Sequence, residues 1–216
     1  MSQNTPTKDM NYVHNVFRDA FARAEMLESI DIHNASQVKH TALYFSSIFT
    51  FLHAHHHTED TYLWPPLLER APEKADIINH GIEQHEALAD ALPNAQKATD
   101  NFAMSPSTES LKKLADAALG VASVLVDHLK DEENNVLPIC SEHITMEEWQ
   151  SLAPHTLSAL EGPTLMMVLG LVNDAFDDDY KAAMAKLMPD ELKNAWVNEG
   201  QKLYQNTMKE MNISLH

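Results

Sequence analysis

Two segments of the chain carry a histidine followed four residues later by a glutamate: His55 with Glu59, and His128 with Glu132. A four-residue step turns an α-helix by about 400°, so the two side chains of each pair lie on one face, a turn apart. Each pair ends a stripe of apolar residues, so the face that carries it should be buried. Because a buried carboxylate needs a compensating charge, the two pairs together predict a shared cation.

Two further stripes each hold one more histidine, His14 in the first and His85 in the third. Four helices should therefore direct four imidazoles and two carboxylates into one interior. This ligand set suits iron, manganese or zinc. A two-metal site that is rich in carboxylates, inside a helical bundle, favours iron, because both glutamates can bridge the ions.

A count of ligands supports a pair of ions. Two ions with about six positions each offer about twelve positions, of which four histidines fill four and two bridging glutamates fill four. An oxo or hydroxo bridge between two iron ions fills two more. About two positions then remain for a small ligand such as dioxygen, nitric oxide or peroxide.

Other histidines have weaker claims to ligation. A single pair with this spacing on a solvated face usually forms only an i,i+4 contact. His143 and Glu147 have the spacing, but they lie near a capping box at Thr145 and are expected to begin a helix. His53 and His57 lie off the stripe and should be at the surface or be partners of the ligands.

The elements that position these residues can be recognised from periodicity. Apolar stripes with helical spacing run from Met10 to Ala24, from Val38 to Tyr62, from Ile78 to Leu92 and from Leu111 to Glu132. Pro65 should end or kink the second helix, and Pro93 should weaken or end the third. The stripes predict an all-α fold in which residues 8–140 form an up-down-up-down four-helix bundle.

Residues 143–216 are expected to form further helices packed on the bundle. Pro154 and Gly162 should break the chain, and the Met-rich run from Leu165 to Val172 should serve as packing material. A last helix is predicted from Asp190 to Met211, with Tyr204 available to dock.

Composition excludes several classes of function. The 216 residues carry a net charge of −17, which argues against binding nucleic acid. The single cysteine, Cys140, fits a reducing compartment, and no secretory signal or run long enough to cross a bilayer is apparent, so we expect a cytoplasmic protein that does not bind a membrane. Motifs of nucleophile-elbow hydrolases, NTPases, dinucleotide-binding enzymes and zinc ribbons are missing, as is the Glu-x-x-His of ferritin-like proteins.

The histidine motifs also carry a resemblance to a known family. His14, the segments FLHAHHHTEDTYLWPPL, EQHEALADAL and DHLKDEENNVLP, and their order make residues 10–140 resemble the hemerythrin HHE cation-binding family. The rest of the chain resembles the C-terminal helical extension of bacterial hemerythrin-like proteins. The resemblance implies a non-heme di-iron centre that binds or reacts with oxygen species.

One position departs from the family pattern. Oxygen-carrying hemerythrins have a second histidine four residues before the one that aligns with His85, and here that place is Gly81. The missing imidazole argues against reversible oxygen carriage. His56, Asp60 and Tyr204 are candidates for an additional ligand or for a partner of a ligand.

Three functions are compatible with these residues. The first is a di-iron protein that binds or senses dioxygen, nitric oxide or peroxide, or that handles iron under oxidative stress. The second is an oxygen-activating or peroxide-decomposing enzyme on the same centre. The third is a metal-free helical interaction module, for which a stable bundle without bound metal would be expected.

Overall fold

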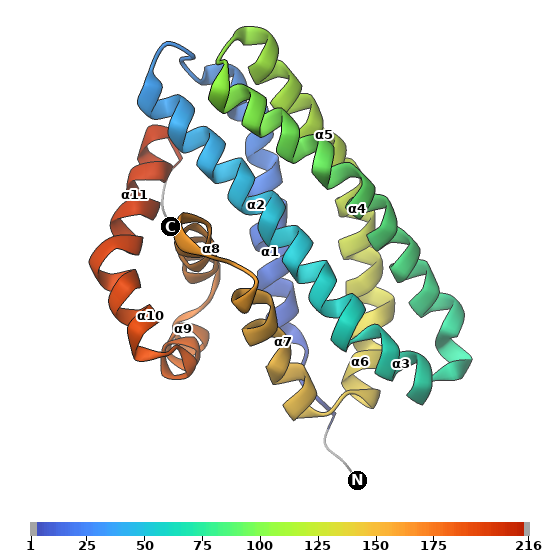
Figure 1. The fold of residues 1–216 in the computed structure, drawn as a ribbon. Helices are drawn as coiled ribbons and strands as arrows, with labels where there is room; N and C mark the ends of the chain where they lie inside the picture. Colours follow the sequence, from blue (N-terminus) through green and yellow to red (C-terminus); the bar gives the residue numbers. More distant parts are fainter. Residues whose placement is uncertain (1–3, 214–216) are drawn as a thin grey trace.

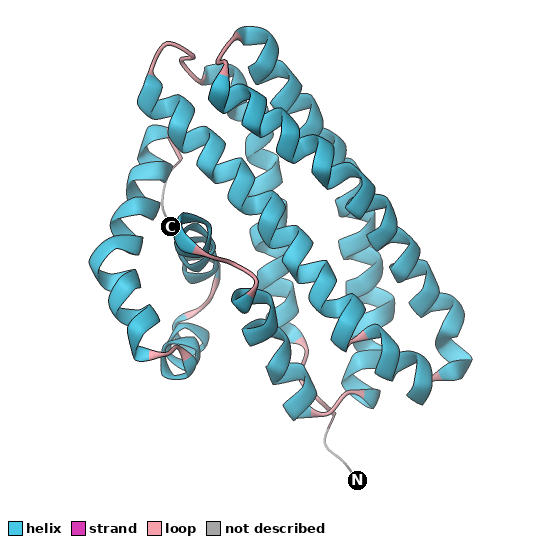
Figure 2. Ribbon diagram, viewed as in Figure 1, coloured by secondary structure: helices cyan, strands magenta, loops and turns pink. Residues whose placement is uncertain are grey.

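A computed structural model of the protein describes residues 4–213, apart from the side chains at positions 183, 184 and 187. Helices make up almost all of this part of the chain, and it contains no strand (Figure 2). Among the same residues, no helix combines the length and the apolar character that crossing a membrane requires. The all-α prediction is confirmed.

Four long helices form the bundle: α1 (Lys8–Ala22), α2 (Ala35–Tyr62), α4 (Ala75–Met104) and α5 (Thr108–Asp131). Helix α2 packs along α4, α4 along α5, and α1 along both α5 and α2 (Figure 1). Short elements connect them: the 3-10 segment η1 (Arg23–Ser29), helix α3 (Trp64–Arg70) and the 3-10 turn η2 (Pro72–Lys74). The bundle is therefore the scaffold that the apolar stripes predict.

Local sequence explains where the bundle helices begin. The side chain of Asn34 accepts hydrogen bonds from the backbone N–H groups of Ser36 and Gln37 at the start of α2. Ser107 caps α5 together with Ser110. Helix α2 ends at Tyr62, and two prolines follow in the first turn of α3, where no helical N–H is required.

Pro93 does not end the third helix of the bundle, so that part of the prediction is wrong. Helix α4 continues through it to Met104. A proline inside a helix costs about 3 kcal/mol, because one N–H is lost and the ring displaces a carbonyl. Here the proline is exposed, while Leu92 and Ala95 beside it are buried in the core. Packing of that continuous apolar face outweighs the local cost.

Helix α5 leads into a short π-helical turn, η3 (Glu132–Val136), before helix α6 (Leu137–His143). The turn begins at Glu132, one of the predicted ligands. Pro138 lies in the first turn of α6, so the chain continues as helix beyond the expected end. Single π-turns inside α-helices are frequent at functional sites because they redirect side chains.

The remaining helices are α7 (Met146–Ser158), α8 (Gly162–Ala175), α9 (Asp178–Leu187), α10 (Asp190–Ala195), the π-turn η4 (Trp196–Gly200) and α11 (Gln201–Glu210). Thr145 and Glu148 form the predicted capping box of α7. Helices α7, α8 and α11 all pack against α2 (Figure 1). Met167 and Val168 of the Met-rich run are fully buried.

A close helix contact between α8 and α11 depends on Gly170. An ideal Cβ at this position would lie 2.3 Å from Cγ of Tyr204. Gly170→Ala should therefore lower the free energy of unfolding by roughly 1–3 kcal/mol through overpacking. Gly120→Ala is the matched control, because no atom lies within 4 Å of its ideal Cβ. It should stabilise α5 by roughly 0.5–1 kcal/mol. Thermal melts that shift in the same direction for both variants would contradict this contact.

Candidate metal centre

The predicted ligands form a polar layer between two apolar clusters. Along α2, for example, Leu52 belongs to the larger cluster, His55 and Glu59 follow, and Leu63 belongs to the smaller one. On α1, Phe17 and Met10 lie on either side of His14 in the same way. The layer consists of His14, His55, His56, Glu59, His85, His128 and Glu132, and each member is 5% exposed or less.

Glu59 faces imidazoles from two helices. Its Oε1 lies 3.4 Å from Nε2 of His55, and its Oε2 lies 3.6 Å from Nε2 of His85. Neither contact counts as a hydrogen bond of the protein, because both oxygens lack a partner. Ligand atoms of one ion approach one another in this way without bonding to each other.

Glu132 also faces two imidazoles, but through a single oxygen. Its Oε2 lies 3.4 Å from Nε2 of His14 and 3.5 Å from Nε2 of His128. Each carboxylate of the layer therefore touches two imidazoles, and no imidazole is shared between these contacts.

Unpartnered polar atoms concentrate in this layer. Within the described part of the chain, eleven buried side-chain nitrogen or oxygen atoms have no hydrogen-bond partner, and nine of them belong to the layer. The nine are Nε2 of His14, His55, His56, His85 and His128, and both carboxylate oxygens of Glu59 and Glu132. Leaving so many polar atoms unpaired costs about 1–3 kcal/mol for each. Every one of them is a suitable metal-ligand atom, so the layer fits a group of cations.

Hydrogen bonds at the far side of the rings orient three of the imidazoles. Nδ1–H of His85 donates to Oδ1 of Asp60 at 2.7 Å, and Nδ1–H of His14 donates to Oε1 of Glu133 at 2.9 Å. Nδ1–H of His128 donates to Oε1 of Gln84 at 3.2 Å. Such bonds fix the tautomer in which Nε2 carries a lone pair, and metal-binding histidines generally have them.

Burial keeps most of the imidazoles neutral. It lowers the pKa of His55 to about 3, with help from neighbouring His14, and it lowers the pKa of His128 to about 4. Burial also lowers the pKa of His56 well below its ordinary value. Neutral imidazoles are the form that binds metal.

The two buried carboxyl groups compete for positive charge. Burial raises the pKa of Glu59 well above its ordinary value, and the neighbouring Glu132 adds to this effect. Burial acts in the same direction on Glu132, but His14 and His128 outweigh it and leave the pKa of Glu132 lowered. The layer can thus ionise both glutamates only with additional positive charge, which bound cations would supply.

The structure brings together all six residues that the stripes single out as ligands: His14, His55, Glu59, His85, His128 and Glu132. His143 and Glu147, with the same spacing, lie outside the layer: His143 ends α6 and does not begin a helix, whereas Glu147 lies in the first turn of α7. His53 and His57 are exposed. His56 joins the layer, and Asp60 lies behind it as the partner of His85.

Tyr204 was a candidate ligand, and the structure contradicts this. Its hydroxyl donates to Oδ2 of Asp174 at 2.6 Å, and its ring lies against Gly170. Three residues further along α11, Thr207 is hydrogen-bonded to Nδ1 of His40 at 2.7 Å. His40 is fifteen residues before His55 on α2, or about 22 Å along the helix. The phenol thus belongs to the packing between α8 and α11.

Three residues near the layer had no clear signal in the sequence. Glu133 holds His14 and also pairs with Arg18 at 2.8 Å. Gln84 holds His128, and the indole N–H of Trp64 donates to Asp60 at 2.9 Å. Their roles depend on contacts between helices, which no spacing along one helix reveals. The only local indication of such a role was that Glu133 directly follows the predicted ligand Glu132 in the sequence.

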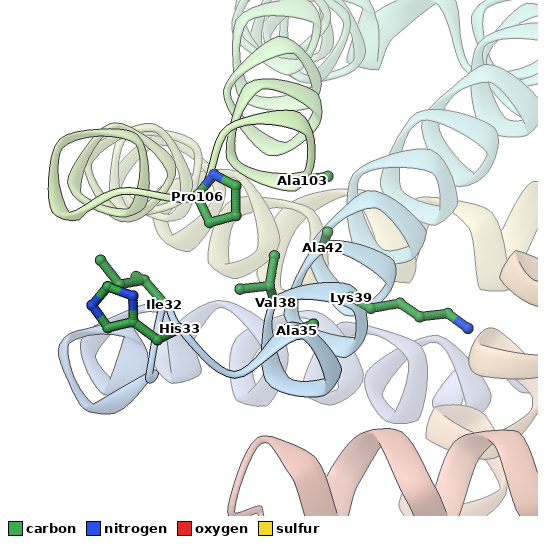
Figure 3. Close-up of a pocket in the computed structure, with 8 residues that line it drawn as sticks. All are labelled: Ile32, His33, Ala35, Val38, Lys39, Ala42, Ala103 and Pro106. Carbon is green, nitrogen blue, oxygen red and sulfur yellow. The ribbon is translucent and has the colours of Figure 1, made fainter.

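Two cavities differ in their relation to the layer. A small one of about 60 Å³ reaches His56, His85 and Asp60, with exposed His53 and His57 also on its wall. The larger one, of about 370 Å³, lies at the start of α2 beside Val38 and Pro106 (Figure 3). Val38 is seventeen residues from His55, or about 25 Å along the helix, so the larger cavity is separate from the centre.

Comparison with known proteins agrees with this geometry. A family model described as the hemerythrin HHE cation binding domain matches residues 5–140, a span that includes every residue of the polar layer. Searches among curated proteins and among solved structures found no match. The matched span is more than half of the 216-residue chain, and the chain belongs to the hemerythrin HHE cation-binding domain family.

Proposed function

We propose that this protein holds a pair of iron ions and uses them to bind or sense dioxygen, nitric oxide or peroxide, or to handle iron under oxidative stress. The proposed ligands are His14, His55, Glu59, His85, His128 and Glu132. The observation that carries the proposal is the set of unpartnered, buried ligand atoms that face one another. Iron bound by imidazole and carboxylate can exchange electrons with small oxygen and nitrogen species.

The residues of the chain have distinct roles in this proposal. Glu59 and Glu132 would bridge, because each faces imidazoles from two helices. Asp60, Glu133 and Gln84 hold three rings in the orientation that ligation requires. The apolar clusters on both sides exclude bulk water, which strengthens the electrostatic interactions within the layer.

The size of the nearby cavity favours a small ligand. Pockets for drug-sized molecules occupy about 300–1,000 Å³, whereas the cavity beside His56 and His85 has about 60 Å³. Dioxygen, nitric oxide and peroxide fit such a space. For the same reason, the second candidate function, a di-iron enzyme, is better supported as peroxide decomposition than as oxidation of a bulky substrate. The buried thiol of Cys140 fits a reducing, cytoplasmic setting.

Protein expressed with ample iron should contain about two iron ions per chain and show the ultraviolet-visible absorption of oxo-bridged ferric iron. Titration with nitric oxide, dioxygen and hydrogen peroxide should then change this spectrum, because the ligand count leaves room for a small molecule. Catalytic release of dioxygen from peroxide would favour the enzyme. Protein that purifies with one zinc ion, or with no metal after iron supplementation, would refute the di-iron proposal.

Glu59→Ala and His128→Ala should each weaken iron binding more than about tenfold, because each removes a proposed ligand. The matched controls are His143→Ala and Glu147→Ala, which have the same four-residue spacing outside the layer. Chelator competition measures the affinities. The ligand assignment is wrong if the first two variants retain the affinity of the parent.

Asp60→Ala should weaken iron binding by about 10- to 100-fold, since it removes the hydrogen bond that orients His85. Asp60→Asn retains an oxygen that accepts from Nδ1–H, so it should recover part of the affinity. If both variants bind iron as the parent does, Asp60 has no role in orienting His85.

A further inference from the structure

The family pattern has a fifth imidazole where this chain has Gly81, on α4. The candidate to replace it lies on the neighbouring helix α2. We infer that His56 is a direct ligand of the metal centre and supplies the imidazole that Gly81 lacks. The inference rests on the proposed iron-binding function and extends it to a residue outside the two H-x-x-x-E motifs. It changes the centre from four imidazoles to five.

Helical geometry places Glu59 between two histidines. At about 100° for each residue, Glu59 projects about 40° to one side of His55 and about 60° to the other side of His56. A bridging carboxylate at this position can therefore share one ion with each histidine. The consecutive residues His55 and His56 would therefore let α2 supply one imidazole to each ion of the proposed pair.

The surroundings of His56 are those of a ligand. It is 5% exposed, and its Nε2 is buried without a hydrogen-bond partner. Its ring centre lies 4.1 Å from that of His85 and 5.0 Å from that of His128. Ligand atoms of these three histidines all lie within 4.8 Å of one another. The same is true of His55, His56 and Glu59.

His56 lies between two sets of imidazoles. It is grouped with His85 and His128, and its ring centre also lies 5.5 Å from that of His55, whose own ring centre is 5.8 Å from that of His14. Glu59 touches one member of each set, His85 and His55, and Glu132 likewise touches His128 and His14. With His56 assigned to the side of His85 and His128, which lie nearer to it, the donor set is three imidazoles on one side, two on the other, and two carboxylates between them.

Trp64 lies beside position 81. An ideal Cβ on Gly81 would lie 3.7 Å from Cη2 of Trp64, which is an ordinary van der Waals contact. The indole is held there by its hydrogen bond to Asp60. Gly81 supplies no ligand atom from α4, whereas His56 of the neighbouring helix α2 places its Nε2 in the layer.

The position of His56 has a competing explanation, namely that its ring is there only to stack on that of His85, because the planes of the two rings differ by only 24°. His56→Phe separates the explanations, because phenylalanine retains a ring for stacking but has no nitrogen. His56→Ala tests rescue, because it enlarges the small cavity that His56 lines and makes room for added imidazole. His57→Ala is the matched control, as the next residue on the same helix with an exposed side chain.

Iron content and chelator competition with ferrous iron are measured for the parent and the three variants. Circular dichroism of the metal-free proteins establishes that each variant is folded. His56→Ala and His56→Phe should weaken binding of the more weakly held ion by about 10- to 100-fold, while His57→Ala leaves it unchanged. Added imidazole should restore binding to His56→Ala and not to His56→Phe.

Parent-like affinity in a folded His56→Phe variant would show that His56 only stacks, and the inference would fail. The proposed function would still stand in that case, provided that Glu59→Ala loses iron. A parent protein without iron would refute both. Loss of iron in both His56 variants without rescue of His56→Ala by imidazole would also count against direct ligation.

Discussion

Two buried glutamates impose the main constraint on this molecule. Glu59 and Glu132 lie in a layer of five imidazoles, with apolar clusters on either side and no hydrogen-bond partner within the described structure. Such a layer is unfavourable unless cations neutralise it. The lengths of the four helices, their antiparallel packing and the hydrogen bonds behind the rings all serve to bring these donors from separate helices to one level.

Much of this arrangement could be predicted from periodicity. Residues such as His55 and Glu59 repeat the spacing of the apolar stripe, so their face and their burial follow from the helix itself. His56 was only one of several options, because its role depends on contacts with His85 and His128, which lie on other helices. Tyr204 could not be placed, since the sequence does not reveal where a C-terminal helix docks. The predicted helix end at Pro93 was wrong because tertiary packing of α4 outweighed the tendency of proline to end a helix.

The π-turn at Glu132 had no counterpart in the sequence pattern. A π-turn holds one more residue than the same turn of α-helix and so changes the register of the residues that follow. Glu132 faces His14 and His128 inside the layer, and Glu133 reaches Nδ1 of His14 from its outer side. Two adjacent carboxylates thereby act on the same imidazole from opposite sides. Glu132 faces the interior of the layer, and Glu133 holds the ring by a hydrogen bond.

Helix α2 is enclosed far more completely than its neighbours. Fifteen of its 28 residues are buried, against eight of 30 in α4, because the C-terminal helices cover the face that a free bundle would expose to water. Substitutions on most sides of α2 therefore disturb either the metal layer or the contacts with the C-terminal helices. Over evolutionary time, α2 should change slowly and together with α7, α8 and α11, while the outer surfaces of α4 and α5 remain free to diversify.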